Sequence, residues 1–472
     1  MFRENVHRKL GWVLVLSLLL FASAEFLLRG PIRFARANID DFISPYIQTK
    51  AWMKGVDPYS PADLVALWPK DAEQFMFLKK DLADGSLVLK RGIPTAYPPT
   101  CFVLLVPVAW LPWHVARHVW LAISLMAFGL TVLSLVSLIG FQWHEKRTYL
   151  FLALALALAP FHTGLAAGSI VIVAVGLCAL AVLTADRQWD VTTGVLFGVA
   201  IGLKPQIGLP FLVYYLLRHR WRAVTTAVTV LAILAATAIF HLAMSHTPWV
   251  DNYQYDNRVL FAHGSLGDFT EANPLRFGLV NLQVLLYTFV PDRAGVNVAA
   301  LVMAGALGLF WLFLLLHRAD SKNELLALAA LTVLSLLPVY HRLYDASLLI
   351  FPLAWSLAAL PEFRKKLARG ILLLILVFLV PGGSALEQFQ HTSHLVTLQH
   401  SWWWTHIVMP HQVWALLFMS VLLLVAMRTS VAKMAAPSRG SLPDRGLREK
   451  EGSSHAQRPT HLLSLHTVVS NR

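Results

Sequence analysis

The sequence predicts an all-α polytopic membrane protein, and three observations support this class. Hydrophobic residues make up 57% of the 472 residues and charged residues only 14%, whereas soluble domains carry roughly 25% charged residues. The mean hydropathy is +0.60. The apolar residues also occur in blocks separated by polar connectors, which indicates that lipid surrounds much of the chain. Counted together, the blocks predict about twelve transmembrane helices.

The first apolar block covers residues 10–28 and follows the basic residues Arg8 and Lys9. It is similar to a signal peptide, but Glu25 and Arg29 stand where a cleavage site needs small residues. We therefore expect a retained anchor whose N-terminus is cytoplasmic.

The polar stretch that comes next, residues 29–96, mixes charges of both signs with aromatic residues. Because it comes after a span that starts in the cytoplasm, we expect it to form an extracytoplasmic loop. Its basic residues do not oppose this placement, since loops longer than about 60 residues escape the charge rule. Large apolar residues at helical spacing over 39–53 predict an amphipathic helix at the membrane interface.

Eleven further apolar blocks follow, several of them shorter than the roughly 20 residues that a perpendicular span needs. Short spans are tolerated where they line a protein-filled or wet space. The blocks cover residues 98–112, 117–140, 148–160, 168–185, 191–217, 221–243, 294–316, 324–339, 344–360, 368–383 and 406–427.

Basic connectors indicate which ends of these spans are cytoplasmic. The connectors cover 218–222, 317–322 and 364–369. The tail, 431–472, is basic and rich in Ser, Pro and Gly, which predicts a disordered cytoplasmic end after a membrane domain of residues 1–430.

Counting from these connectors places residues 245–273, 340–345 and 381–405 outside the cytoplasm. Two topologies remain open between residues 97 and 217. If 98–112 is re-entrant, Lys204 moves from the middle of the membrane to its outer mouth.

Composition also excludes several classes of function. The net charge of +13 is explained by cytoplasmic connectors and the tail, so nucleic-acid binding is not indicated. The two cysteines, Cys101 and Cys178, lie in apolar blocks and offer neither a disulfide framework nor a metal cluster. Nucleotide-binding and metalloprotease motifs are missing from the sequence. We therefore expect no metal and no cofactor.

Two adjacent carboxylates, Asp40 and Asp41, stand just after the first block. A carboxylate in this position can act as a general base toward a hydroxyl. The same residues can instead cap the helix that comes after them, and chemistry alone favours the cap. Gly55 and Pro58 predict the end of that helix and a turn.

Charged residues also interrupt later apolar blocks. Lys204 with Pro205 breaks the block 191–217, and a lysine inside a membrane segment marks a functional site unless it snorkels to the interface. The outer turn 340–345 contains His341, Arg342 and Asp345. His341 and Arg342 can hold a phosphate while Asp345 orients one of them, or the turn is simply a solvated hairpin.

Taken in order, these stretches resemble the GT87 (DUF2029) family of GT-C glycosyltransferases over residues 10 to 430. The matching residues are Asp41-Phe42, Tyr46, the Gly-x-Asp-Pro-Tyr of 55–59, Tyr97-Pro98-Pro99, Lys204-Pro205-Gln206 and the turn 340–345. The resemblance implies a GT-C-like bundle of about twelve helices in a bacterial inner (plasma) membrane, with both termini cytoplasmic.

The resemblance further implies a reaction. Such enzymes transfer a hexose, often mannose, from a polyprenyl-phosphate donor to a lipid or glycan acceptor at the extracytoplasmic face. Asp41 takes the role of general base, with Asp40 as substitute. Lys204, His341 and Arg342 would offset the donor phosphate. The remaining substrate-binding candidates are Tyr46, Asp57, Tyr59, Tyr97, Gln206 and Asp345.

One position departs from the family, and two other functions stay open. Ser169 stands where the family often has the amide of a Gly-Gln pair, which puts the sugar or the acceptor in doubt. A transporter or flippase would show internal repeats and charges across the midplane. An oligosaccharide polymerase or ligase would be expected to carry its large outer loop late in the chain, whereas here it comes after the first span.

Overall fold

The architecture was obtained as a computed structural model, which describes residues 2–36, 41–75, 78–80, 87–89, 97–317, 324–361, 365–380, 382–383, 386 and 401–435. The chain divides into a unit of Met1–Val431 and a second unit of Ala432–Arg472. The apolar blocks and the charged interruptions predicted from the sequence all lie in the first unit. Of the tail predicted to be disordered, residues 431–435 continue a helix, and the rest lies outside the described residues.

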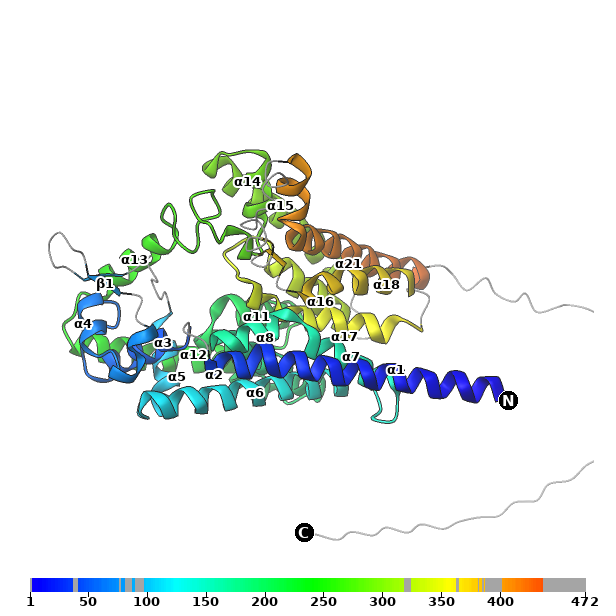
Figure 1. The fold of residues 1–472 in the computed structure, drawn as a ribbon, viewed down its shortest axis with the longest axis horizontal. Coiled ribbons are helices and arrows are strands. Elements are labelled where there is room, and N and C mark those ends of the chain that lie inside the picture. The colour runs from blue at the N-terminus through cyan, green and yellow to red at the C-terminus, as the bar shows by residue number, and fades with distance from the viewer. Residues whose placement is uncertain are drawn as a thin grey trace, which may run out of the picture. The chain divides into compact units, whose positions relative to one another are not determined.

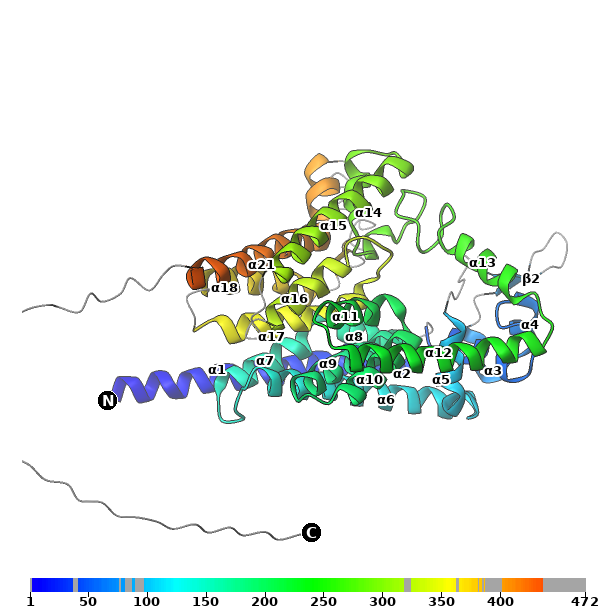
Figure 2. The ribbon, with the colours of Figure 1, turned by 180° about the vertical axis from the view of Figure 1, so that it is seen from behind.

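The described residues of the first unit form helices and one small antiparallel hairpin (Figure 1, Figure 2). Its first half contains α1 (Phe2–Leu27), η1 (Leu28–Ile32), α2 (Arg33–Arg36), α3 (Ile43–Met53), α4 (Pro61–Ala66), η2 (Lys70–Phe75), β1 (Leu78–Lys80), β2 (Leu87–Leu89), α5 (Pro99–Ala109), α6 (Trp113–Leu138), α7 (Lys146–Ala157), α8 (Ala159–Ala167), α9 (Val171–Asp186), α10 (Asp190–Leu203) and α11 (Pro205–Leu217). Its second half contains α12 (Trp221–Met244), α13 (Trp249–Leu260), η3 (Arg276–Gly278), α14 (Leu282–Phe289), α15 (Arg293–Leu316), α16 (Glu324–Ser335), η5 (Leu343–Leu349), α17 (Ile350–Ala359), α18 (Lys365–Leu376), η6 (Val377–Leu379), η7 (Trp404–Val408) and α21 (His411–Ala435). Strands β1 and β2 pair antiparallel, with Leu78 opposite Leu89.

Five helices of the described residues are long and apolar enough to cross a membrane, which agrees with the predicted class. They are Lys9–Arg36, Trp113–Leu138, Trp221–Met244, Arg293–Leu316 and His411–Thr429. The pair α7 and α8 is bent by 46° and gives a sixth span if it counts as one. Six shorter apolar helices accompany them, so the total of twelve spans stays a prediction.

Proline explains where predicted blocks divide into two helices. Pro160 stands in the first turn of α8 and Pro205 in the first turn of α11, where the missing N–H of proline costs nothing. The block 148–160 therefore ends in the bend between α7 and α8, and the block 191–217 breaks at Lys204, as the sequence predicted.

The first helix lies along α7 and is mostly uncovered by protein. Trp12 contacts Tyr149 edge to face at 5.4 Å, and Phe26 stacks on Phe128 at 4.8 Å. Only 11% of its apolar window is buried, so lipid has to cover the rest. Figure 1 shows α3 and α4 near the end of α1 that lies away from the N-terminus.

The predicted amphipathic helix exists as α3, but it is buried rather than spread on the interface. Tyr46 donates its hydroxyl to the carbonyl of Leu111 at 2.8 Å, and the Trp52 indole donates to the carbonyl of Ala238 at 3.2 Å. These bonds hold α3 against neighbouring helices on more than one side. Gly55, with φ of +67°, comes after the helix end as predicted.

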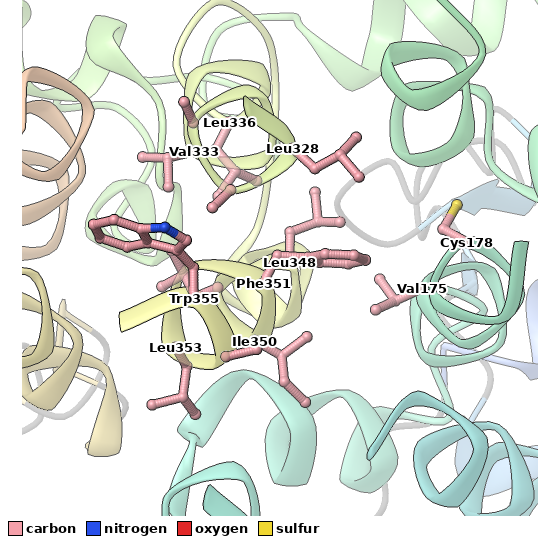
Figure 3. Close-up of a cluster of buried hydrophobic side chains, with 14 of the residues drawn as sticks. Val175, Cys178, Leu328, Val333, Leu336, Leu348, Ile350, Phe351, Leu353 and Trp355 are labelled. Atoms are coloured by element: carbon pink, nitrogen blue, oxygen red, sulfur yellow. The ribbon is translucent and has the colours of Figure 1, made fainter. Parts of the chain in front are cut away.

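The main core joins α9, α16, η5 and α17 in a continuous apolar cluster (Figure 3). Leu348 and Phe351 are fully buried and face Val175 and Cys178 of α9 and Leu328 of α16. Because this packing leaves no room for a shift, it fixes η5 and the charged turn that precedes it.

Candidate functional site

Four separate parts of the chain supply the candidate site. They are the turn at Asp41, the residue Tyr97 before α5, the break at Lys204, and the turn 340–345 that leads into η5. The site thus forms where helices begin or end, since backbone irregularity in a membrane protein is tolerated only inside protein or beside a wet cavity.

The break between α10 and α11 places Lys204 in the site. Its backbone is extended, with φ of −150°, because Pro205 begins the next helix. The side chain is buried, and its Nζ lies 2.6 Å from Oδ1 of Asp345 and 5.1 Å from the ring centroid of Tyr344. The snorkelling alternative is therefore wrong, since the ammonium group turns into the protein.

Asp345 gathers three donors from around it. Besides Lys204, the backbone N–H of Arg342 donates to Oδ2 at 2.9 Å, and Nδ1 of His341 lies 3.2 Å from the same oxygen. His341 also contacts the Ser335 carbonyl through Nε2 at 3.1 Å. Asp345 therefore orients both Lys204 and His341, and the turn is an organised scaffold rather than a solvated hairpin.

Asp41 is held at the C-terminal end of α8. Its backbone N–H donates to the carbonyl of Ala167 at 2.6 Å. The N-cap of α3 is Phe42, not Asp41. The capping alternative for Asp41 is therefore wrong, and its carboxylate is available for another role.

Three residues of the late turn and of the helix break surround the Asp41 carboxyl. Burial raises its pKa above the ordinary value of 3.8, while the positive charges of Arg342 and Lys204 and a hydrogen bond from the Tyr344 hydroxyl act in the opposite direction. Asp41, Lys204 and Arg342 are far apart in the sequence, yet their charges interact in the folded chain.

The site has two layers that differ in exposure. Lys204, His341 and Asp345 are buried and form a supporting layer. Asp41, Tyr97, Tyr340, Arg342 and Tyr344 are partly exposed and form an accessible layer. Burial and then the negative charge of Asp41 raise the pKa of the Tyr97 hydroxyl.

Other predicted residues have structural contacts away from this cluster. Asp57 accepts from the backbone of Tyr59 at 2.8 Å and from the amide of Asn252 at 2.7 Å, and so ties the first loop to α13. The Tyr59 hydroxyl donates to the carbonyl of Tyr97 at 2.8 Å, and Tyr46 contacts Leu111 as described. These residues shape the loop around the site.

The remaining predicted residues are Gln206 and Asp40. Gln206 is partly exposed in the first turn of α11, close in sequence to Lys204. Asp40 lies outside the described residues, and so does most of 381–405. Within the described residues, no three His, Cys, Asp or Glu side chains gather as metal ligands would.

Sequence reasoning assigned no role to Tyr344. The hydroxyl of Tyr344 reaches Asp41, and its Cβ lies so close to Gly164 of α8 that a Cβ on that glycine would stand 3.4 Å away. The only available signal was the placement of this tyrosine between Arg342 and Asp345.

The fold and the site therefore define a helical membrane protein with a charged site among helix ends. The sequence model of glycosyltransferase family 87 matches residues 95–352, which is more than half of the chain. The chain belongs to this family.

Curated relatives are similar over a limited part of their length. An alpha-(1->3)-arabinofuranosyltransferase of Mycobacterium tuberculosis is 28% identical over 153 residues, or 30% of this chain and 34% of the relative. A polyprenol-phosphate-mannose-dependent alpha-(1-2)-phosphatidylinositol pentamannoside mannosyltransferase of Mycolicibacterium smegmatis is 29% identical over 139 residues, or 29% and 33%. The chain thus matches about one third of the length of these relatives. No solved structure matches it.

Proposed function

We propose that this protein is an integral-membrane glycosyltransferase that moves a sugar from a polyprenyl-phosphate donor to a hydroxyl of a lipid or glycan acceptor. Membership of family 87 and the glycosyltransferase names of both relatives support the reaction class. The single observation that carries the assignment of residues is the half-buried carboxyl of Asp41 beside Arg342 and Tyr344.

Asp41 acts as general base in this proposal. It takes the proton of the acceptor hydroxyl while the acceptor oxygen bonds to the anomeric carbon. The bond from that carbon to the phosphate oxygen breaks, and its electron pair leaves with the polyprenyl phosphate. A single displacement of this kind inverts the anomeric configuration. A base whose pKa is raised toward the working pH is suited to the step.

Arg342 is the cation in the accessible layer, and we assign to it the contact with the donor phosphate. Guanidinium groups bind phosphate in bidentate fashion. Lys204 and His341 both contact Asp345 and hold it in place. Lys204 also adds positive charge that helps to offset the donor phosphate. Tyr97, Tyr340 and Gln206 would line the space around the sugar, and Asp57 and Tyr59 would shape the loop.

Helix geometry supports an extracytoplasmic site. Helix α11 begins beside the site at Pro205 and ends at Leu217, just before the basic residues Arg218 and Arg220. Its 13 residues span about 20 Å. Basic connectors favour the cytoplasm, so Lys204 belongs to the outer side. We propose a bacterial inner (plasma) membrane location with cytoplasmic termini.

The names of the two relatives suggest two candidate sugars, arabinofuranose and mannose. One relative is named for arabinofuranosyl transfer and the other for mannosyl transfer from polyprenol-phosphate mannose. We propose mannose as the first sugar to test. The Ser169 hydroxyl accepts a hydrogen bond from the backbone N–H of Val171 at 3.5 Å, at the start of α9.

The test measures transfer of labelled sugar from a panel of polyprenyl-phosphate donors, including mannose and arabinofuranose, by membranes containing the protein. Asp41→Asn is expected to lower the rate by about 10²–10⁴, while Asp251→Asn, at an exposed carboxylate of α13, retains the rate. The proposal fails if the wild type transfers no sugar from any donor. If Asp40→Asn is inactive and Asp41→Asn is active, the base is Asp40.

A further inference from the structure

The segment that carries Asp41 meets α6 through aromatic side chains, and the closest of these ring pairs is Phe42 with Trp120. Trp120 of α6 is 3% exposed, and its ring lies parallel to that of Phe42, with 4.5 Å between centroids and 3° between planes. Phe42 directly follows Asp41 and is fully buried. The side chain next to the proposed base therefore cannot turn without moving the indole.

The same indole also binds the other side of the junction. Its Nε1–H donates to the carbonyl of Gly168 at 2.8 Å. Gly168 comes after Ala167, whose carbonyl accepts the backbone N–H of Asp41 at 2.6 Å. Trp120 thus contacts Phe42, the neighbour of Asp41, and Gly168, the neighbour of Ala167.

Local backbone geometry shows why this junction needs to be held. Gly168 has φ of +68° and ends α8 in the left-handed region, which glycine adopts without strain. Gly168 is free to move unless other groups hold it. The hydrogen bond from Trp120 and the bond from the Ser169 N–H to the Gly164 carbonyl at 2.9 Å fix its position.

We infer that Trp120 is a positioning residue for catalysis, which sets the place of the Asp41 carboxylate through Phe42 and Gly168. The inference rests on the proposed function of Asp41. Trp120 itself touches no reacting atom, since its ring is enclosed by Phe42 and the α8 terminus. A general base must lie within hydrogen-bond reach of the proton it takes, and an error of about 1 Å lowers a rate up to about 100-fold.

The experiment compares Trp120→Phe with Trp311→Phe. Trp311 is 4% exposed, and its indole donates to the Ala327 carbonyl at 3.0 Å, so the two changes remove equivalent bonds. Trp120→Phe is expected to lower kcat about 10-fold with KM for the lipid donor within about twofold of wild type. Trp311→Phe retains the wild-type kcat after correction for folded protein.

A second readout follows the Asp41 carboxyl without any turnover. A carbodiimide with a glycine ester labels carboxyls, and mass spectrometry of the Asp41 peptide gives the labelling rate at each pH. Trp120→Phe is expected to change the rate and the pH midpoint of labelling, because Asp41 shifts relative to Arg342, Lys204, Asp345 and Tyr344. Trp311→Phe leaves both unchanged.

The outcomes separate this inference from the proposed function. If wild type transfers no sugar, the proposed function fails, and the labelling alone decides whether Trp120 positions Asp41. The inference is overturned if Trp120→Phe matches Trp311→Phe in kcat and labelling. If Trp120→Phe does not fold, Phe42→Leu is tested in its place. The inference is overturned if Phe42→Leu has the same kcat and the same labelling as wild type. A lower kcat at constant KM supports the inference.

Discussion

Lys204 and Asp345 are 141 residues apart in the chain, yet Nζ of one lies 2.6 Å from Oδ1 of the other. The side chains are only 10% and 1% exposed. This ion pair joins the break between α10 and α11 to the first turn of η5, and the two halves of the site are thereby fixed to each other. Removing one partner leaves a buried charge without compensation.

We expect Lys204→Met to lower the free energy of unfolding by about 3–5 kcal/mol, because Asp345 keeps its buried charge. The double variant Lys204→Met/Asp345→Leu should be more stable than the single one, since neither charge remains. Thermal unfolding in detergent measures both. Arg220→Met serves as a control, because the Arg220–Asp190 pair is more exposed and its loss costs less. Equal losses in the two single variants would contradict the argument.

The pH dependence of sugar transfer should reflect the surroundings of Asp41. A base works when it is ionised, so the rate rises as pH passes upward through its pKa. Burial raises that pKa above 3.8 and Arg342 opposes the shift. Arg342→Gln removes the opposing charge, so we expect the acid limb of the kcat profile to move to higher pH.

The matched control for this shift is Arg342→Lys, which keeps the positive charge and loses the bidentate geometry. Its acid limb should stay near that of wild type, while KM for the phosphate donor rises. An acid limb that moves to lower pH in Arg342→Gln would show that Arg342 does not interact with the catalytic base.

Sequence reasoning predicted which charged residues belong to the candidate site, but it did not predict which of them contact each other. Asp41, Lys204, His341 and Arg342 were found because charge beside apolar blocks is costly and therefore conspicuous. Tertiary contacts between distant segments decide that Lys204 and His341 contact Asp345. The sequence does not reveal such contacts. The number of transmembrane helices is also hard to predict from hydropathy. Prolines such as Pro160 divide apolar blocks into short helices, and hydropathy does not show which of these cross the membrane.

The contact between the first loop and α13 should weaken as pH rises. Asp256 of α13 is buried, and burial together with the negative charge of Asp57 raises its pKa to about 7. A folded-state pKa above the unfolded one contributes stability at low pH, which is lost as pH rises toward 7. We expect the melting temperature of wild type to fall between about pH 4, near the unfolded pKa of 3.8, and about pH 7, and then to level.

Asp256→Asn should flatten this profile, because the amide mimics the protonated acid at every pH. Asp57→Asn should flatten it as well by removing the charge that raises the pKa of Asp256, although it also alters the bond to Asn252. A wild-type melting temperature that rises steadily over the same window, with no change in Asp256→Asn, would refute this account of Asp256.

Topology between residues 97 and 217 can be tested at the two ends of α11. In a background that lacks Cys101 and Cys178, Gln206→Cys should react with a membrane-impermeant maleimide from the extracytoplasmic side. His219→Cys, at a position past the other end of α11, should react only from the cytoplasmic side. Labelling of position 206 from the cytoplasm alone would place Lys204, and the proposed site with it, on the wrong side.

A last prediction concerns two glycines that both lie inside helices. Gly194 packs closely against a neighbouring helix, and Gly305 does not. A Cβ on Gly194 of α10 would clash with the carbonyl oxygen of Ala223 in α12, whereas a Cβ on Gly305 of α15 would meet no atom within 4 Å. Overpacking costs typically about 1–3 kcal/mol, while alanine is favoured over glycine in an open helix by about 1 kcal/mol. Gly194→Ala should therefore lower the melting temperature and Gly305→Ala should keep or raise it. Equal melting temperatures in the two variants would mean that α10 and α12 do not pack as closely as described.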